Sequence, residues 1–181
     1  MEFFDTGIDG LKLIKPRIFP DSRGYFFESF SKTKFPDDSI YDWVQDNESK
    51  STRGVLRGLH YQTGKHAQAK LVRAVVGAIY DVVVDIRPDS DTFGKWYGTE
   101  LNDQNKLQLL IPRGFAHGFL VLSEEAIFSY KCDNYYNEES EGGILYSDKN
   151  LEIDWPLDDL SFQLSEKDAR LPNFGQHKPF R

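Results

Sequence analysis

The sequence is poor in cysteine, in basic residues and in long apolar runs. Cys132 is the only cysteine among 181 residues, so no disulfide can form within the chain, and its simplest interpretation is a small buried apolar side chain. The formal net charge of -7 argues against bulk nucleic acid or an anionic membrane as partner, because either would favour a basic face. No apolar stretch approaches the length that spans a bilayer, and residues 1–10 lack the basic start and apolar run of a secretory signal. These absences predict a protein of the reduced, cytoplasmic compartment.

Helical periodicity is also scarce, and short β-rich runs broken by Gly, Pro, Asn and Asp take its place. Strands are predicted over residues 11–19, 25–30, 70–76, 79–86, 106–111, 119–122 and 127–132. We expect helices only as short pieces, near residues 31–35 and 165–170. Without a repeat or a linker, residues 1–181 are expected to form a single domain. The pattern indicates an all-β antiparallel jelly-roll barrel, with the acidic, loop-rich chain after Tyr135 packed on it as a C-terminal cap.

One predicted strand, residues 79–86, carries two aspartates inside an apolar run. Gly77-Ala78 separates it from the strand before it, which predicts a hairpin between the two. Asp81 and Asp85 are evenly spaced and therefore share one face of the strand. That face is either solvent or the lumen of a barrel, and a lumen lined with carboxylates would be functional.

Residues 53–62 place two arginines, two glycines and a histidine in one β-compatible stretch. A guanidinium is a planar fork that matches phosphate, and glycine lets the backbone approach a ligand. For Arg53, a merely exposed charge is an equally good interpretation. For Arg57, which lies between Leu56 and Leu59, a role in binding is favoured.

A Pro-x-Gly-x-x-His element at residues 112–117 matches the element that supplies a metal ligand in cupin barrels. The partner element should offer a His-x-His pair and a glutamate, but residues 60–62 read His-Tyr-Gln and His66 is followed by Ala and Gln. Two histidines, His60 and His117, do not complete a transition-metal site. The sequence thus favours a cupin-like barrel without metal, in which imidazoles serve in acid–base chemistry or hydrogen bonding.

On the predicted strand 127–132, Tyr130 alternates with Phe128 and Cys132 and should point into the same interior. A buried tyrosine hydroxyl needs a hydrogen-bond partner or a chemical role. Composition alone favours ordinary core packing for this aromatic cluster.

Five segments are informative as an ordered set: residues 55–60, 70–73, 81–87, 112–119 and 134–136. In this order they closely resemble the dTDP-4-dehydrorhamnose 3,5-epimerase family, and the resemblance extends from residues 19–24 to residues 165–168. It departs in minor ways at Tyr61, where phenylalanine is common, and at Tyr146, where tryptophan often stands.

The resemblance implies a homodimeric jelly roll of the cupin class that needs neither metal nor organic cofactor. Members act on a deoxythymidine diphosphate sugar with a ketone at C4, and they invert C3 and C5 on the route to dTDP-L-rhamnose. Both carbons adjoin the same carbonyl, so removal of either proton gives an enolate on one shared oxygen. Such chemistry needs a base on one face, a donor on the other, and a positive or hydrogen-bonding group at the oxyanion.

By position, His60 resembles the family's base, and Asp168 resembles the carboxylate that binds and activates it. Without the resemblance, residues 165–168 would be interpreted first as a helix N-cap with an acidic third residue. Tyr130 matches the general acid, Lys70 matches the cation at the enolate oxygen, and His117 matches a residue that lines the sugar pocket.

The resemblance also implies a nucleotide-binding set drawn from several parts of the chain. This set comprises Arg23, Phe26, Glu28, Gln45, Asn47, Arg57, Tyr136, Glu141 and Lys167. Trp155 is either a further pocket wall or a core residue. In the family the N-terminal strands cross to the partner subunit, which implies that Arg23 and Glu28 serve the neighbouring site.

Three alternatives remain open on the sequence alone. A mono-epimerase that inverts only C3 or only C5 of a related 4-keto-6-deoxy sugar nucleotide would use the same base and acid. A non-catalytic sugar-nucleotide-binding module would not require His60, Lys70, Tyr130 and Asp168 together. A metal-dependent cupin oxygenase would require the missing ligands.

Overall fold

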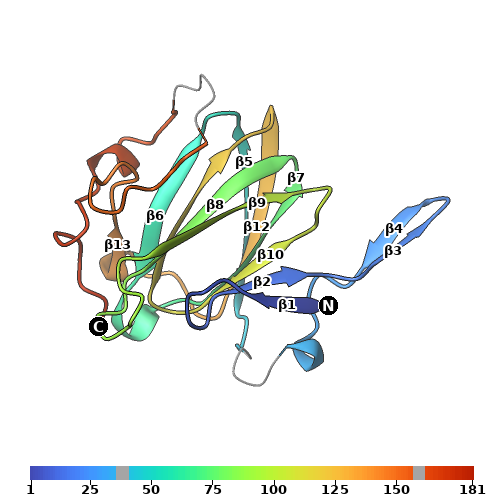
Figure 1. The fold of residues 1–181 in the computed structure, drawn as a ribbon, viewed down its shortest axis with the longest axis horizontal. Helices are drawn as coiled ribbons and strands as arrows, with labels where there is room; N and C mark the ends of the chain where they lie inside the picture. The colour runs from blue at the N-terminus through green and yellow to red at the C-terminus, as the bar shows by residue number, and fades with distance from the viewer. Residues whose placement is uncertain (36–40, 157–161) are drawn as a thin grey trace.

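The computed structural model describes residues 1–35, 41–156 and 162–181, and two facing antiparallel sheets dominate it (Figure 1). The six-stranded sheet has the order β1 (Glu2–Asp5), β2 (Lys12–Lys15), β10 (Gln108–Ile111), β7 (Lys70–Val76), β12 (Glu125–Cys132) and β5 (Gln45–Thr52). The five-stranded sheet has the order β13 (Glu141–Gly143), β6 (Leu56–Gln62), β11 (Phe115–Val121), β8 (Ala78–Asp85) and β9 (Trp96–Asn102). The predicted all-β jelly roll is confirmed.

A third, two-stranded sheet projects from this body as a hairpin, β3 (Ile18–Asp21) and β4 (Gly24–Phe27) (Figure 1). The helical segments that the structure describes are short 3-10 turns, as expected: η1 (Lys32–Lys34), η3 (Gly64–His66), η4 (Glu138–Ser140) and η5 (Asp168–Arg170). Within the described residues, no helix has the length and apolar character needed to cross a membrane.

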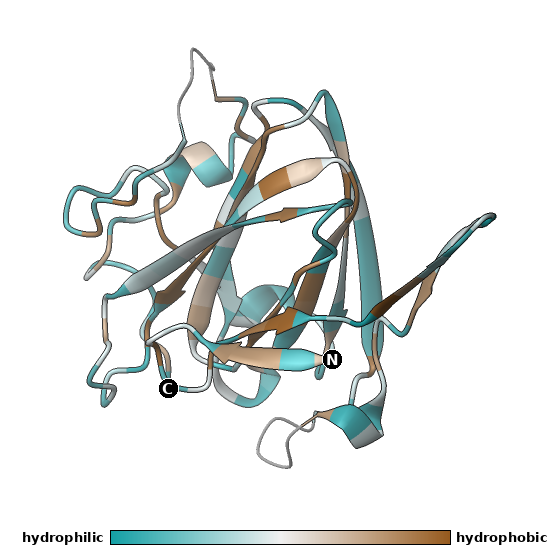
Figure 2. Ribbon diagram, turned by 45° about the vertical axis from the view of Figure 1, so that its right-hand side comes forward, coloured by the Kyte–Doolittle hydropathy of each residue, from teal (hydrophilic) through white to brown (hydrophobic). Residues whose placement is uncertain are grey.

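The interior between the two sheets is apolar at one end and polar at the other. Its apolar part is built from inward-facing residues of both sheets, including Val72, Val83, Leu109, Phe119 and Phe128. Apolar residues accordingly lie mainly on the strands (Figure 2). Burial of these side chains drives the two sheets together, since each Å² of apolar surface removed from water contributes about 25 cal/mol.

The C-terminal chain covers the outer face of the five-stranded sheet, beside β6 (Figure 1). Its residues Ile144, Leu151 and Trp155 pack against Leu56 and Leu120 of that sheet. Trp155 is 6% exposed, and its indole Nε1 donates to the Tyr146 carbonyl at 3.0 Å. The predicted C-terminal cap is thus confirmed, and Trp155 is a core residue.

The connection at Gly77 is not a hairpin, which corrects the sequence prediction. β7 pairs with β10 and β12, whereas β8 pairs with β9 and β11, so the chain crosses from one sheet to the other at this turn. Gly77 has a φ of 73°, and a Cβ there would lie 2.1 Å from the Glu125 carbonyl oxygen. A tight sandwich corner therefore has the same local sequence signal as a hairpin turn.

The predicted strand boundaries agree best with the observed ones where one face of the strand is apolar. The prediction of 70–76 is confirmed, but 11–19 is wrong as one strand, because the chain breaks at Pro16 and Arg17 into β2 and β3, which belong to different sheets. β1, β5, β9 and β13 were not predicted as strands, and β6 was described only as a β-compatible stretch. β5 reads Gln-Asp-Asn-Glu-Ser-Lys-Ser-Thr, without any apolar residue that would show its alternation.

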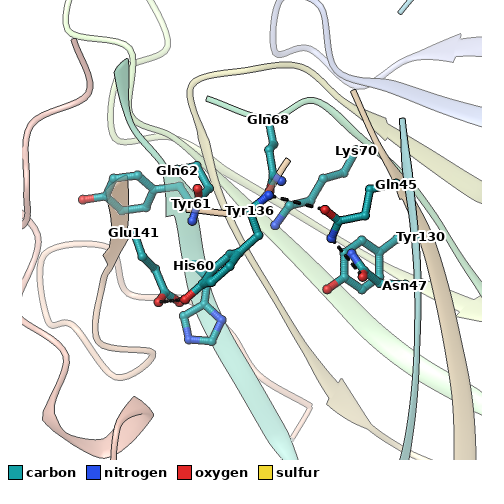
Figure 3. Close-up of a pocket in the computed structure, with 10 residues that line it drawn as sticks. All are labelled: Gln45, Asn47, His60, Tyr61, Gln62, Gln68, Lys70, Tyr130, Tyr136 and Glu141. Carbon is teal, nitrogen blue, oxygen red and sulfur yellow. Dashed lines mark hydrogen bonds between the residues drawn. The ribbon is translucent and has the colours of Figure 1, made fainter. Parts of the chain in front are cut away.

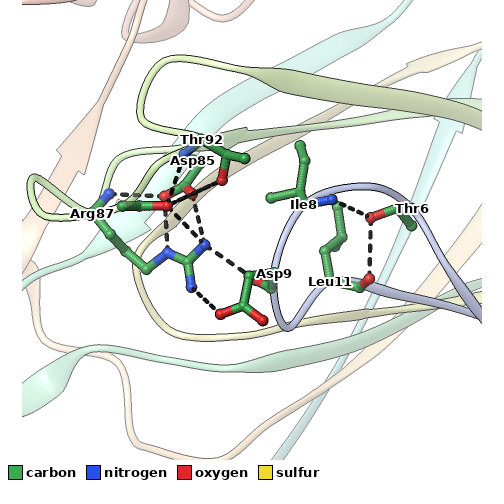
Figure 4. Close-up of polar contacts among 8 residues, drawn as sticks. Thr6, Ile8, Asp9, Leu11, Asp85, Arg87 and Thr92 are labelled. Carbon is green, nitrogen blue, oxygen red and sulfur yellow. Dashed lines mark hydrogen bonds and ion pairs between the residues drawn. The ribbon is translucent and has the colours of Figure 1, made fainter.

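Asp81 and Asp85 are both fully buried and face the interior, so the lumen interpretation is confirmed for this strand. Asp85 lies at the end of β8, where it binds Arg87 and the hydroxyls of Ser90 and Thr92, each hydroxyl at 2.6 Å (Figure 4). Arg87 also donates to the Asp9 carbonyl at 3.1 Å and so fastens the β1–β2 loop. Asp85 therefore holds loops together, and only Asp81 belongs to the site described next.

Candidate active site

A β-bulge in β6 turns two functional side chains to the same side. His60 pairs with His117, and Arg57 pairs with Phe119, so three steps along β6 match two steps along β11. The extra residue lets Arg57 and His60 both line the interior, while Leu56 and Leu59 both face the cap. Gly58 lies at this point with a φ of 116°, and a Cβ there would lie 2.6 Å from the Gly118 Cα.

Two adjoining cavities occupy the polar end of the interior, and they share His60, Lys70 and Tyr130. The first cavity, of about 340 Å³ (Figure 3), is lined by Gln45, Asn47, His60, Tyr61, Gln62, Gln68, Lys70, Tyr130, Tyr136 and Glu141. The second cavity, of about 270 Å³, is lined by Ser49, Arg57, His60, Lys70, His117, Gly118, Phe119, Phe128, Tyr130, Ser165, Lys167 and Asp168.

His60 and Asp168 form a hydrogen-bonded pair although 108 positions separate them in the sequence. The His60 Nε2 lies 2.5 Å from Asp168 Oδ1, and the side chains are 31% and 5% exposed. Burial alone would raise the pKa of Asp168, but hydrogen bonds from His60, Ser165 and the Gly58 backbone hold it below its usual range. The Asp168 amide also donates to Ser165 Oγ at 3.0 Å, but η5 begins at Asp168 with Lys167 at its N-cap position, so the interpretation of Ser165 as a helix N-cap is wrong.

Lys70 and Tyr130 meet where the two cavities join. The Lys70 ammonium lies 5.8 Å from the centroid of the Tyr130 ring, and it forms no ion pair with any described residue. Burial lowers the pKa of Lys70, although the nearby Cys132, Asp81 and Glu141 oppose the shift. Burial also raises the pKa of Tyr130, so its phenol keeps its proton at neutral pH. The site thus holds a poorly solvated amino group beside a hydroxyl that can donate.

A second imidazole–carboxylate pair closes the inner wall of the second cavity. The His117 Nε2 lies 2.9 and 3.1 Å from the two carboxylate oxygens of Asp81, and the side chains are 6% and 0% exposed. The His117 ring also stacks on Phe128 at 5.9 Å between centroids. Asp81 was not among the predicted site residues, and its even spacing with Asp85 was the only local signal for it.

Three side chains, Tyr136, Glu141 and Lys167, form a hydrogen-bonded group that we call the rim. Glu141 Oε2 accepts from the Tyr136 hydroxyl at 2.9 Å and from Lys167 Nζ at 2.5 Å. The bond to Glu141 raises the pKa of Lys167. Burial raises the pKa of Glu141, but its bonds to Lys167 and Tyr136 outweigh burial and lower it.

The rim continues onto β5 through a chain of amide contacts. The Tyr136 backbone amide donates to Gln45 Oε1 at 3.3 Å, and Gln45 Nε2 donates to Asn47 Oδ1 at 3.0 Å (Figure 3). Gln45 and Asn47, two of the predicted substrate-binding residues, therefore both line the first cavity. Ser49, Gln62, Gln68 and Ser165 also line the cavities, and sequence reasoning missed them because single uncharged polar residues carry no spacing signal.

Arg57 is exposed at the edge of the second cavity, where its Nε donates to Ser51 Oγ at 3.0 Å. Its terminal guanidinium nitrogens thus remain available to a ligand. Lys167, which directly precedes Asp168 in the chain, lines the same cavity. The other ionisable residues that line the second cavity are His60, Lys70, His117 and Asp168.

Three of the predicted substrate-binding residues lie away from both cavities in the single chain. Arg23 pairs with Asp21 at the tip of the β3–β4 hairpin, at 2.6 Å, and its side chain is 87% exposed. Phe26 is 66% exposed on the same hairpin, and Glu28 follows it and pairs with Lys34. One chain therefore does not bring these residues to His60.

Among the described residues, no three side chains of His, Cys, Asp or Glu gather in a way that could hold an ion. The Nε2 atoms of His60 and His117 each contact a different carboxylate.

Comparison with known proteins agrees with this geometry. The family model for dTDP-4-dehydrorhamnose 3,5-epimerase matches residues 5–176. The chain is 52% identical over 176 residues to the dTDP-4-dehydrorhamnose 3,5-epimerase of Shigella flexneri, covering 96% of each chain.

Two solved structures are also similar over nearly the whole chain. The dTDP-4-dehydrorhamnose 3,5-epimerase of Elizabethkingia anophelis is 52% identical, with a TM-score of 0.91 and 97% of each chain covered. The dTDP-6-deoxy-D-glucose-3,5-epimerase of Legionella pneumophila, in complex with dTDP-4-keto-L-rhamnose, is 49% identical, with a TM-score of 0.92 over 97% of this chain and 93% of that one. These likenesses confirm the predicted cupin-like jelly roll. The chain therefore belongs to the dTDP-4-dehydrorhamnose 3,5-epimerase family of carbohydrate epimerases.

Proposed function

We propose that this chain converts dTDP-4-dehydro-6-deoxy-D-glucose to dTDP-4-dehydro-L-rhamnose by inverting C3 and C5. The observation that carries the proposal is the meeting of His60, Lys70 and Tyr130 in one cavity, with Asp168 bound to the His60 ring. His60 comes from the five-stranded sheet, and Tyr130 comes from the facing six-stranded sheet (Figure 3). A sugar ring between them would have a base on one face and a proton donor on the other.

In this mechanism His60 removes the proton at C3 or C5, and the electron pair moves onto the C4 oxygen as an enolate. Asp168 stabilises the imidazolium that forms, as a buried carboxylate with lowered pKa can do. The Lys70 ammonium stabilises the enolate oxygen, and it does so far better in a cavity than in water. Tyr130 then delivers a proton to the opposite face of the carbon. The C4 ketone then re-forms, and solvent takes the proton from His60 and returns one to Tyr130. A second cycle at the other carbon completes the double inversion.

The remaining residues bind the nucleotide in this proposal. Arg57 and Lys167 in the second cavity hold the diphosphate, because both are cations able to donate to phosphate oxygens. Gln45, Asn47 and Tyr136 contact the rest of the nucleotide, Glu141 takes part through its bonds to Tyr136 and Lys167, and His117 lines the sugar pocket.

We further propose a homodimer in which each β3–β4 hairpin reaches the partner's site and supplies Arg23, Phe26 and Glu28. The hairpin projects from the body with Phe19, Tyr25 and Phe26 at 45%, 56% and 66% exposure (Figure 1). An isolated two-stranded hairpin is marginally stable in water, and an apolar surface of this kind is typical of an interface.

Mixed dimers test the exchange. R23A and H60A homodimers should both lose activity, while a dimer of one R23A and one H60A protomer should keep about half, because one of its two sites is then complete. If Arg23 serves its own chain, the mixed dimer stays inactive.

Nuclear magnetic resonance in deuterated water tests the reaction itself. With dTDP-4-keto-6-deoxyglucose as substrate, deuterium should enter both C3 and C5. Entry at one carbon would support the mono-epimerase, and entry at neither would support a binding module. We also propose that the protein is active in the cytoplasm and needs neither a metal nor an organic cofactor. Loss of activity in the presence of a chelator, with recovery after iron is added, would contradict the absence of a metal requirement.

A further inference from the structure

The rim joins two segments of the chain through a single carboxylate oxygen. Glu141 Oε2 is the common acceptor for Tyr136 and Lys167, and the Glu141 side chain is only 16% exposed while that of Lys167 is 57% exposed. Figure 3 shows the Tyr136 ring reaching toward Glu141 next to His60. The rim therefore connects the lining of the first cavity, at Tyr136 and Glu141, with that of the second cavity, at Lys167.

The charges of the rim oppose the binding of an anion. Lys167 lines the second cavity together with Arg57, where the proposed function requires a diphosphate. In the free protein, however, the Lys167 ammonium is already paired with Glu141. An anionic ligand that reaches Lys167 must replace this carboxylate, and it is also repelled by the charge on Glu141.

We propose that Glu141 is a counter-ion that competes with the nucleotide: it holds Lys167 in an ion pair in the free enzyme and releases it to the diphosphate on binding. This inference rests on the proposed function. The Tyr136 hydroxyl bonds to the same Glu141 oxygen in its own right, at 2.9 Å, and in this proposal it keeps that bond when Lys167 leaves. Glu141 is thus a positioning residue that sets which anions gain access to Lys167.

Calorimetric titration with dTDP tests the competition. In E141Q the amide oxygen still accepts from Tyr136, but the negative charge is gone and Lys167 is free. We expect E141Q to bind dTDP about threefold more tightly than the wild type, the scale of an exposed ion pair. In a K167M background only the direct repulsion by Glu141 is left to relieve, so the same substitution should give a clearly smaller gain. The KM of E141Q for the sugar nucleotide should fall with kcat changed less.

E139Q is the matched control, because Glu139 is an exposed residue of η4 that lines neither cavity. It removes the same charge two positions away and should leave dTDP affinity unchanged. Unchanged or weaker binding of dTDP by E141Q, or an equal gain in E139Q, would overturn the proposal for Glu141. The proposed function would still stand in that case if the wild type exchanges deuterium into the substrate. Failure of the wild type to bind dTDP would overturn both.

Discussion

His60 and His117 lie directly opposite each other on β6 and β11, yet each imidazole binds a different carboxylate. The His60–Asp168 pair is open to the cavities, with His60 31% exposed. The His117–Asp81 pair is closed, with exposures of 6% and 0%. The open His60–Asp168 pair can thus exchange a proton with a ligand, whereas the closed His117–Asp81 pair holds its imidazole ring in a fixed position.

Replacement of the open imidazole should abolish the chemistry and spare binding. H60A is expected to slow deuterium exchange at both carbons by roughly 10²- to 10⁴-fold, since general-base catalysis contributes this much. Affinity for dTDP should change little, because the imidazole acts on the sugar. A variant that exchanges either carbon at the normal rate would show that another group is the base.

Tyr130 should affect inversion more than exchange. In Y130F the ring keeps its packing against Phe128, at 5.5 Å between centroids, and only the proton donor is lost. His60 can still remove a proton and return it to the same face, so deuterium should enter while product forms slowly. Equal loss of exchange and product would contradict the role of general acid.

The two arginines near β6 should differ in binding. R57A is expected to weaken dTDP binding about tenfold or more, because a hydrogen bond to a charged group contributes roughly 1.5–3 kcal/mol. R53A is the matched control, since Arg53 is exposed and lines neither cavity. Calorimetry with dTDP compares them, and equal losses would indicate a general effect of charge.

Asp85 should stabilise the fold without taking part in binding. Burial raises its pKa, but the bonds from Arg87, Ser90 and Thr92 outweigh burial and lower it below the ordinary 3.8. A carboxylate of lowered pKa stabilises the folded state fully above pH 3.8, and this stabilisation is lost as the pH falls from there through the folded-state pKa.

D85N should therefore reduce the free energy of unfolding at neutral pH by on the order of 3 kcal/mol, as expected when one partner of a buried ion pair is removed. The difference from the wild type should shrink below pH 3.8. Urea unfolding at several pH values measures this, and exposed Asp89 provides the control D89N. A constant difference across this range would show that the charge of Asp85 is not responsible.

Much of the architecture could be predicted because it depends on local alternation and turn residues. Strand 70–76 and the even spacing of Asp81 and Asp85 were visible in this way. β5 was not visible, because its inward residues Gln45 and Asn47 line the cavity and its outward residues face solvent. A strand whose inward side chains line a polar site shows no alternation of apolar and polar residues.

The sequence by itself determined the all-β class of the fold and, through the ordered motifs, named most of the residues that line the two cavities. Only the tertiary structure decided that Gly77 is a corner between sheets, that Asp81 is the partner of His117, and that Arg23 lies away from its own cavity. The physical reason is that side-chain periodicity fixes which face a residue occupies along its own strand. It does not fix which sheet that strand joins, and the sheet determines which distant side chains meet.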